Sequence, residues 1–159
     1  MVVGVVLEVA QGDLFTATRG GGLFLNGQRT GVSTRAGLDR SLVTTGFPFR
    51  DHTKTYIDAY IQVLQSFVMN CIGVRRLGSA AMDLAYVACG RLDGFFEIGL
   101  SPWDLAAGLL LVEEGGGRVS DFGGELTHLF SGQVLASNGL IHDQMCALSA
   151  PLHNAINKS

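Results

Sequence analysis

Apolar strands and amphipathic helices alternate through the second half of the chain, and this order is compatible with few folds. Strands are predicted over residues 71–76, 92–98, 118–121 and 134–137, and helices over 79–89, over 101–114 and from about residue 140. Glycine follows two of the helices, at Gly90 and Gly115, where left-handed C-terminal caps are expected. Such alternation is typical of layered α/β folds.

The first half of the chain has the pattern of antiparallel strands. Residues 2–9 are a dense β-branched run, and further strands are predicted over 14–18, 23–25, 28–30 and 42–45. Asn26-Gly27 marks a tight hairpin, because both residues tolerate the positive φ that such a turn requires. Apolar residues between Tyr56 and Phe67 recur at helical spacing inside a predicted helix over 53–68. We therefore expect one α/β domain over residues 1–159, an α+β layered sandwich.

Composition excludes several classes of protein. The net charge of −3 and the scattered basic residues predict no direct binding of nucleic acid. No apolar run approaches the roughly 18–20 residues of a membrane span, so no membrane association is expected. The 22 glycines stand singly or in short runs between apolar segments, where they indicate turns and caps.

Cysteine and histidine give no sign of a disulfide framework or a metal centre. The three cysteines are odd in number and far apart in apolar stretches, which favours a reducing cytoplasm. The four histidines, His52, His128, His142 and His153, have no metal-ligand spacing. We expect each of them to have an ordinary structural role.

Two predicted helix starts carry residues that could bind a ligand. In Leu77-Gly78-Ser79-Ala80-Ala81, glycine would let a phosphate approach the free N–H groups at the positive end of the helix dipole. A tight turn at Gly78 and a helix cap at Ser79 explain the same residues, and the local sequence favours that explanation.

The second helix start is Ser101-Pro102-Trp103-Asp104. Aspartate three residues after serine resembles a capping box, and local sequence favours this role over metal binding by Asp104. Glu97 ends an apolar strand seven residues earlier. The two carboxylates would line one cleft if the strand end faces the helix start, and Glu97 would otherwise be a solvated strand end.

Four segments in this order and spacing resemble the inositol monophosphatase family. They are Gly78-Ser79-Ala80-Ala81, Asp93-Gly94-Phe95-Phe96-Glu97, Trp103-Asp104-Leu105-Ala106-Ala107-Gly108 and Glu114-Gly115-Gly116-Gly117. The Trp-Asp element followed by Glu-x-Gly-Gly is specific to that family. Thr45-Gly46-Phe47-Pro48-Phe49 resembles its bacterial branch, the extragenic-suppressor type.

The resemblance implies a fold, a reaction and a set of site residues. The fold would be the C-terminal part of the αβαβα sugar-phosphatase sandwich. The reaction would be Mg²⁺-dependent hydrolysis of a small-molecule phosphate ester such as inositol monophosphate, and the enzyme would be a homodimer. Asp104 matches a metal ligand, Glu97 a residue that binds inositol hydroxyls, and Arg75 a residue near the subunit interface. Gly78, Ser79 and Ala80 match the segment that contacts the substrate.

One part of the family pattern is missing. The upstream glutamate pair and the Asp-Pro-(Leu/Ile)-Asp-Gly-Thr metal motif do not occur, and Leu92-Asp93-Gly94 lacks the residues that would make it equivalent. The chain is therefore expected to be a partial domain without the N-terminal metal-binding segment. Mg²⁺ prefers octahedral oxygen coordination, so one carboxylate cannot fix the site, and little or no activity is expected from the chain alone.

Three hypotheses follow from these observations. The chain is a truncated phosphatase or half of a split enzyme, or it is a non-catalytic binding protein that keeps the scaffold and the dimer surface. A minimal phosphatase with a metal site shared between subunits is the third, and the few acidic residues near Asp104 argue against it. Residues 2–9 are expected to expose apolar surface, which would drive dimerisation or aggregation.

Overall fold

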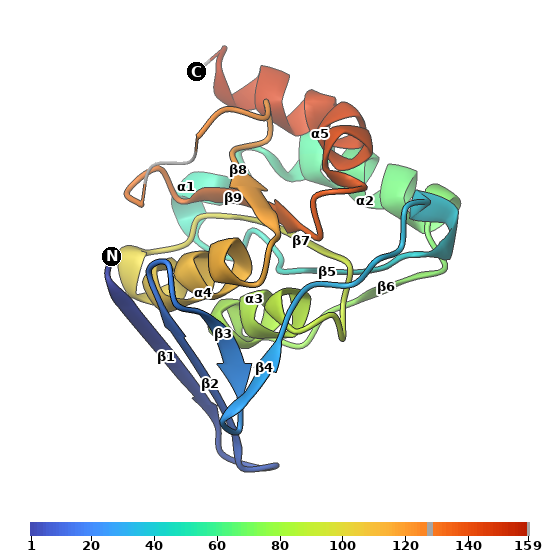
Figure 1. The fold of residues 1–159 in the computed structure, drawn as a ribbon. Helices are drawn as coiled ribbons and strands as arrows, with labels where there is room; N and C mark the ends of the chain where they lie inside the picture. The colour runs from blue at the N-terminus through green and yellow to red at the C-terminus, as the bar shows by residue number, and fades with distance from the viewer. Residues whose placement is uncertain (127–128, 159) are drawn as a thin grey trace.

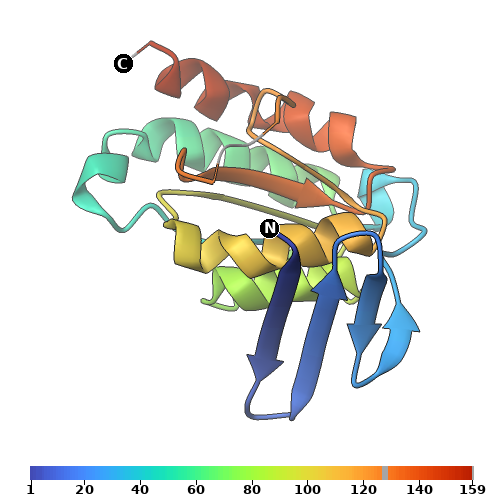
Figure 2. The same ribbon diagram turned by 60° about the vertical axis from the view of Figure 1, so that its left-hand side comes forward.

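The computed structural model describes residues 1–126 and 129–158, which form two β-sheets and two layers of helices (Figures 1 and 2). A four-stranded sheet, a helix pair, a five-stranded sheet and a second helix pair are stacked in that order. This confirms the expected α/β layered sandwich. None of the helices in the described residues is long and apolar enough to cross a membrane.

The first sheet is an antiparallel meander in the order β1-β2-β3-β4. Its strands are β1 (Val3–Glu8), β2 (Asp13–Thr18), β3 (Gly22–Leu25) and β4 (Gln28–Thr30). Asn26 and Gly27 turn the last hairpin at φ of 52° and 79°, as their sequence predicts.

The second sheet has the order β6-β5-β7-β9-β8. Its strands are β5 (Leu42–Thr45), β6 (Gly73–Arg75), β7 (Gly94–Ile98), β8 (Arg118–Ser120) and β9 (Gln133–Ser137). Strand β5 pairs in parallel with both β6 and β7, whereas β9 pairs antiparallel with β7 and β8. The three parallel strands therefore end at one edge of the sheet.

The helices are α1 (Asp51–Lys54), α2 (Ile57–Asn70), α3 (Ala80–Ala88), α4 (Pro102–Glu114) and α5 (His142–Ile156), with a 3-10 turn, η1, at Leu38–Arg40. The predicted helix over 53–68 is wrong at its start. Tyr56 has φ −99° and ψ 10°, so the chain breaks there between α1 and α2. The apolar spacing includes Tyr56 because its ring packs against the core beside α2.

Two apolar cores hold the layers together. Helices α3 and α4 lie between the two sheets, and their core includes Phe15, Leu23, Leu84, Leu105 and Leu110. Helices α2 and α5 cover the other face of the five-stranded sheet, over a core that includes Tyr60, Phe67, Phe96, Leu135 and Met145. Gly108 lets α4 approach α3, because a Cβ there would lie 2.6 Å from the Leu84 Cβ.

The outer face of the first sheet is apolar and exposed. Along β1, Gly4 and Val6 face α4, whereas Val3, Val5 and Leu7 point outward and are 61%, 54% and 55% exposed. The sequence prediction that this segment exposes apolar surface is therefore confirmed.

Candidate functional site

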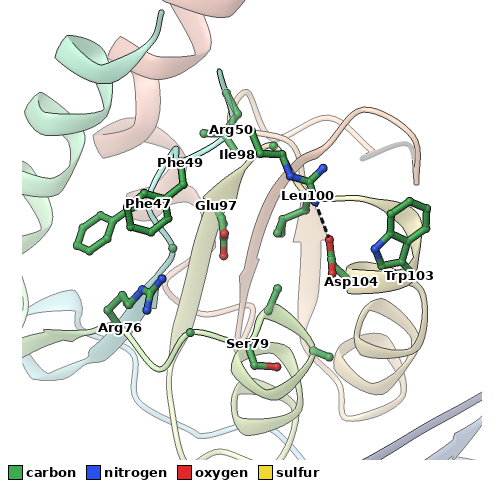
Figure 3. Close-up of a pocket in the computed structure, with 15 residues that line it drawn as sticks. Phe47, Phe49, Arg50, Arg76, Ser79, Glu97, Ile98, Leu100, Trp103 and Asp104 are labelled. Atoms are coloured by element: carbon green, nitrogen blue, oxygen red, sulfur yellow. Dashed lines mark ion pairs between the residues drawn. The ribbon is translucent and has the colours of Figure 1, made fainter. Parts of the chain in front are cut away.

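A cavity of about 360 Å³ opens at the carboxyl ends of β5, β6 and β7 (Figure 3). The connection from β5 to β6 runs through α2 on one face of the sheet, and that from β6 to β7 runs through α3 on the other. Ligands of α/β proteins bind beyond the carboxyl ends of strands where such connections diverge. The N-termini of α3 and α4 form the remaining walls.

The first wall is the turn that leads into α3. Gly78 has φ +94°, a conformation that favours glycine, and Ser79 makes no side-chain hydrogen bond that caps the helix. Gly78, Ser79 and Ala80 all line the cavity. The capping explanation that the local sequence favoured for Ser79 is thus not realised, and the first N–H groups of α3 face the cavity edge without a side-chain cap.

Glu97 lies in the middle of the cavity floor (Figure 3). Its carboxylate packs directly on Gly46, where a Cβ would lie 2.0 Å from the Glu97 Cδ atom. Burial raises the pKa of Glu97 to about 7, with a further rise from Asp83, while Arg76 opposes the shift. A carboxyl group that titrates near neutral pH can donate or accept a hydrogen bond.

Asp104 lies in the first turn of α4, on the side of the cavity opposite Arg76 in Figure 3. Its Oδ2 atom accepts the Ser101 backbone N–H at 2.9 Å, so the capping box that the sequence indicated is present. The same oxygen lies 3.5 Å from Nη2 of Arg50, and Nη1 of Arg50 donates to the Ser101 hydroxyl at 2.8 Å. The dashed line in Figure 3 marks the ion pair.

These residues do not form a magnesium site by themselves. Mg²⁺ takes about six oxygen ligands in near-octahedral geometry. The described residues contain no group of three or more His, Cys, Asp or Glu side chains that could hold a metal. Asp104 supplies one carboxylate, and its Oδ2 atom is already committed to the helix cap and to Arg50.

Two arginines and one aspartate at the site were missed by sequence reasoning. Arg50 pairs with Asp104, and the guanidinium of Arg76 lies 5.7 Å and 5.5 Å from the ring centroids of Phe47 and Phe49. Their roles depend on contacts between segments that are far apart in sequence. An acidic residue within the otherwise apolar helix segment 80–88 is the signal that could have found the third, Asp83.

Asp83 is only 1% exposed and does not line the cavity, but it is close enough to Glu97 to influence the pKa of that residue. It accepts a hydrogen bond from the Thr44 hydroxyl at 2.6 Å. Burial raises the pKa of Asp83 to about 6, although the Thr44 hydroxyl and the positive charge of Arg76 lower it in part. Its negative charge, when present, is one cause of the raised pKa of Glu97.

Arg75 does not join the site. It is exposed on β6, an edge strand, and its Nη1 atom donates to the Val74 carbonyl at 3.2 Å. Its expected position near a subunit interface stays a prediction.

Asp93, the lookalike of the missing metal motif, lies at the amino-terminal end of β7, away from the cavity at the carboxyl ends. Its side chain is 1% exposed and accepts hydrogen bonds from Ser33, from Arg35 at 3.0 Å and from the Leu42 N–H at 2.7 Å. Asp93 is therefore a structural residue.

His142 is buried between two serines, with Nε2 2.8 Å from the Ser120 hydroxyl and Nδ1 2.8 Å from the Ser137 hydroxyl. Ser120 donates its proton to the Asp121 carbonyl, so Nε2 carries the histidine hydrogen and Nδ1 accepts one from Ser137. Burial lowers the pKa of His142 to about 4. The prediction for His128 falls outside the described residues.

Comparisons with known proteins agree with this architecture. The sequence profile of the inositol monophosphatase family matches residues 1–154. The Nus factor SuhB of Salmonella typhimurium is 50% identical over 145 residues, which cover 91% of this chain and 54% of the relative. The Nus factor SuhB of Pseudomonas aeruginosa is 51% identical over 134 residues, which cover 84% of this chain and 49% of the relative. The chain thus spans about half the length of these curated relatives.

Solved structures with the same architecture are also similar in sequence. The extragenic suppressor protein suhB of Bartonella henselae superposes with a TM-score of 0.88 at 38% identity, covering 93% of this chain and 56% of that one. The inositol monophosphatase of Anabaena superposes with a TM-score of 0.86 at 38% identity, covering 92% and 57%.

The relatives correct one expectation. Proteins that are 50% identical to this chain carry the name Nus factor, and this finding contradicts the conclusion that the chain has no direct binding of nucleic acid. That conclusion relied on the net charge of −3, which is a sum over the whole chain. A sum hides local positive charge such as that of Arg50 and Arg76, which are both exposed and both line the cavity.

Proposed function

This chain belongs to the inositol monophosphatase family, and from this premise we propose that its cavity recognises a phosphate monoester such as inositol monophosphate. The observation that supports the proposal is the arrangement of the cavity itself. The segment from Gly78 to Ala80, the carboxyl group of Glu97 and the carboxylate of Asp104 come from three separate elements and line one space.

Each wall of the cavity has a role in this proposal. The uncapped N–H groups at the start of α3 attract the phosphate, aided by the positive end of the helix dipole. Glu97 exchanges hydrogen bonds with hydroxyl groups of the polyol, for which a carboxyl pKa near 7 is suited. Asp104 contributes one carboxylate to the Mg²⁺ on which the family generally depends.

We further propose that hydrolysis requires carboxylates beyond those of the described residues. Groups that stabilise charge in a transition state each contribute several kcal/mol, typically about 3–4 for one lost donor. A chain that supplies Asp104 alone is thus expected to be weakly active or inactive by itself. Activity then depends on a second segment that completes the metal site.

A mixing experiment tests the proposal. Mg²⁺-dependent phosphate release from inositol 1-phosphate would be measured for the chain alone, for the upstream half of a relative alone, and for both together. We expect activity only in the mixture, and its loss with Asp104→Asn. No gain on mixing would count against the split site, and activity of the chain alone that needs Asp104 would reveal unrecognised metal ligands.

A second candidate function is suggested by the relatives' names. We propose as the alternative that the chain is a non-catalytic interaction module for the transcription machinery, because the relatives at 50% identity are called Nus factors. Exposed aromatic side chains near the cavity suit this role: Phe49 is 65% and Trp103 80% exposed beside Arg50 and Arg76. Aromatic rings and arginines together bind single-stranded nucleic acid.

Fluorescence anisotropy with labelled single-stranded RNA tests this alternative. The alternative would be supported if Trp103→Ala weakens RNA binding strongly. Arg75→Gln removes one charge outside the cavity and should weaken RNA binding less. RNA binding that is absent at low salt would count against it.

The remaining expectations concern the setting in which the chain works. We propose a single domain that acts in the cytoplasm, since the cysteines Cys71, Cys89 and Cys146 are all free thiols. We also propose a homodimer with Arg75 near its interface. Sedimentation of the Arg75→Ala variant beside the unaltered chain tests the second proposal, and an unchanged mass would remove Arg75 from the interface.

A further inference from the structure

Asp104 already has a cation beside it. Nη2 of Arg50 lies 3.5 Å from Asp104 Oδ2, and Nη1 of Arg50 donates to Ser101 at 2.8 Å, so the guanidinium spans the first turn of α4. The charge that a divalent ion would supply at this carboxylate is supplied here by a side chain of the same chain.

The chain holds Arg50 in this position through its backbone. Its carbonyl oxygen accepts hydrogen bonds from the N–H of Thr53 at 2.9 Å, from the Thr53 hydroxyl at 2.7 Å and from the N–H of Lys54 at 3.2 Å. The preceding Phe47 and Phe49 form an edge-to-face pair with centroids 5.6 Å apart, and Phe47 packs on the buried Tyr60. The loop that carries Arg50 is therefore anchored at both sides.

A second cation stands on the opposite wall of the cavity. Arg76 lies over the rings of Phe47 and Phe49, and it forms no ion pair within the described part of the chain. In Figure 3 its guanidinium points toward the space between Glu97 and Ser79. With Asp104 neutralised by Arg50, the charge of Arg76 is available to a ligand near the start of α3.

We propose that the cavity binds a phosphate-type oxyanion without a divalent cation, with Arg76 as its main cation and Arg50 as the counter-ion of Asp104. The inference rests on the proposed recognition of a phosphate ester, and it separates that recognition from metal binding. Guanidinium groups suit this task because their planar donors match phosphate oxygens. Phosphate then binds first, and any metal must displace Arg50 from Asp104.

Titration of inorganic phosphate, followed by ³¹P NMR and calorimetry, tests the inference in EDTA and in excess Mg²⁺. We expect dissociation constants that agree within about twofold in the two buffers. Arg76→Gln should weaken binding by about tenfold, as expected for one charge-assisted contact. Arg75→Gln, the matched control outside the cavity, should change it by less than about twofold.

The Arg50→Gln variant separately tests the role of Arg50 as the counter-ion of Asp104. It leaves the Asp104 carboxylate without its counter-ion, so phosphate binding in EDTA should weaken and added Mg²⁺ should restore part of it. The double variant with Asp104→Asn should lose this response to Mg²⁺. Circular dichroism of each variant would confirm that the fold is kept.

Three results would overturn the inference: phosphate binding only in the presence of Mg²⁺, no measurable phosphate binding in either buffer, or equal losses for Arg75→Gln and Arg76→Gln. Its failure is distinguishable from that of the proposed function. Activity in the mixing experiment without phosphate binding in EDTA would leave the phosphatase proposal standing and remove this one. Phosphate binding in EDTA without activity in the mixture would leave this inference standing and remove the phosphatase proposal.

Discussion

Replacing Asp93 should destabilise the protein more than replacing any exposed aspartate. Asp93 Oδ2 accepts the Leu42 N–H at 2.7 Å, and its backbone N–H donates to the Leu42 carbonyl at 2.9 Å. Its Oδ1 atom accepts from Ser33 and from Arg35. One buried side chain thus joins the starts of β5 and β7 to the loop that crosses between the two sheets.

The size of the destabilisation follows from the hydrogen-bonding groups that would lose Asp93 as their partner. Asp93→Ala loses hydrogen bonds to a charged acceptor, worth about 1.5–3 kcal/mol each, and leaves the Leu42 N–H unsatisfied. Arg35 is 52% exposed, so water can solvate its guanidinium in the variant and offset part of the lost stability. We expect a decrease of about 2–4 kcal/mol in the free energy of unfolding, and about 1–2 kcal/mol for Asp93→Asn, which keeps the Leu42 acceptor.

Urea unfolding followed by circular dichroism measures these differences. The matched control is Asp143→Asn, because Asp143 also pairs with an arginine, Arg118 at 2.7 Å, but is 89% exposed. A pair of this kind is worth about 0–1 kcal/mol. If Asp93→Ala cost no more than the control, the assignment of Asp93 as a structural anchor would be refuted.

Three further perturbations have defined outcomes. Gly108→Ala should destabilise by about 1–2 kcal/mol in urea, despite the better helix propensity of alanine, because its Cβ would collide with Leu84; a more stable variant would show that the helices can separate at no cost. Asp83 has a raised pKa, so the folded state keeps a proton that the unfolded state loses between about pH 4 and 6, and stability falls as pH rises through this range. Asp83→Asn should flatten the pH dependence of the urea midpoint, and an unchanged profile would contradict the raised pKa. Val5→Lys should reduce self-association, since Val5 is 54% exposed on an apolar strand face; sedimentation showing a monomer for the unaltered chain at tens of micromolar would contradict the premise.

Local chemistry made much of the fold predictable. Strand β5 begins and ends at the predicted residues, and the Asn26-Gly27 turn has the expected backbone. The position of β5 between β6 and β7 was not predictable, because parallel pairing depends on contacts between distant segments rather than on any local pattern.

The residues of the candidate site likewise divide into those that the sequence predicted and those that it did not. Family motifs located Glu97 and Asp104, and the structure brings both to one cavity. Arg50 and Arg76 carry no motif, since each depends on a partner from another part of the fold: Asp104 for the first, and the two phenylalanines of the β5–α1 loop for the second.

The position of the first sheet in the chain has a consequence for folding during synthesis on the ribosome. Residues 3–30, which form the four-stranded meander, are synthesised before α4, which covers the inner face of the meander, and β5, α2, β6, α3 and β7 are made in between. During that interval both faces of a nascent apolar sheet meet solvent and other chains, which is the condition that favours aggregation. The rate at which α4 leaves the ribosome, together with chaperone binding to β1 and β2, is therefore expected to govern how much of the chain reaches its folded state.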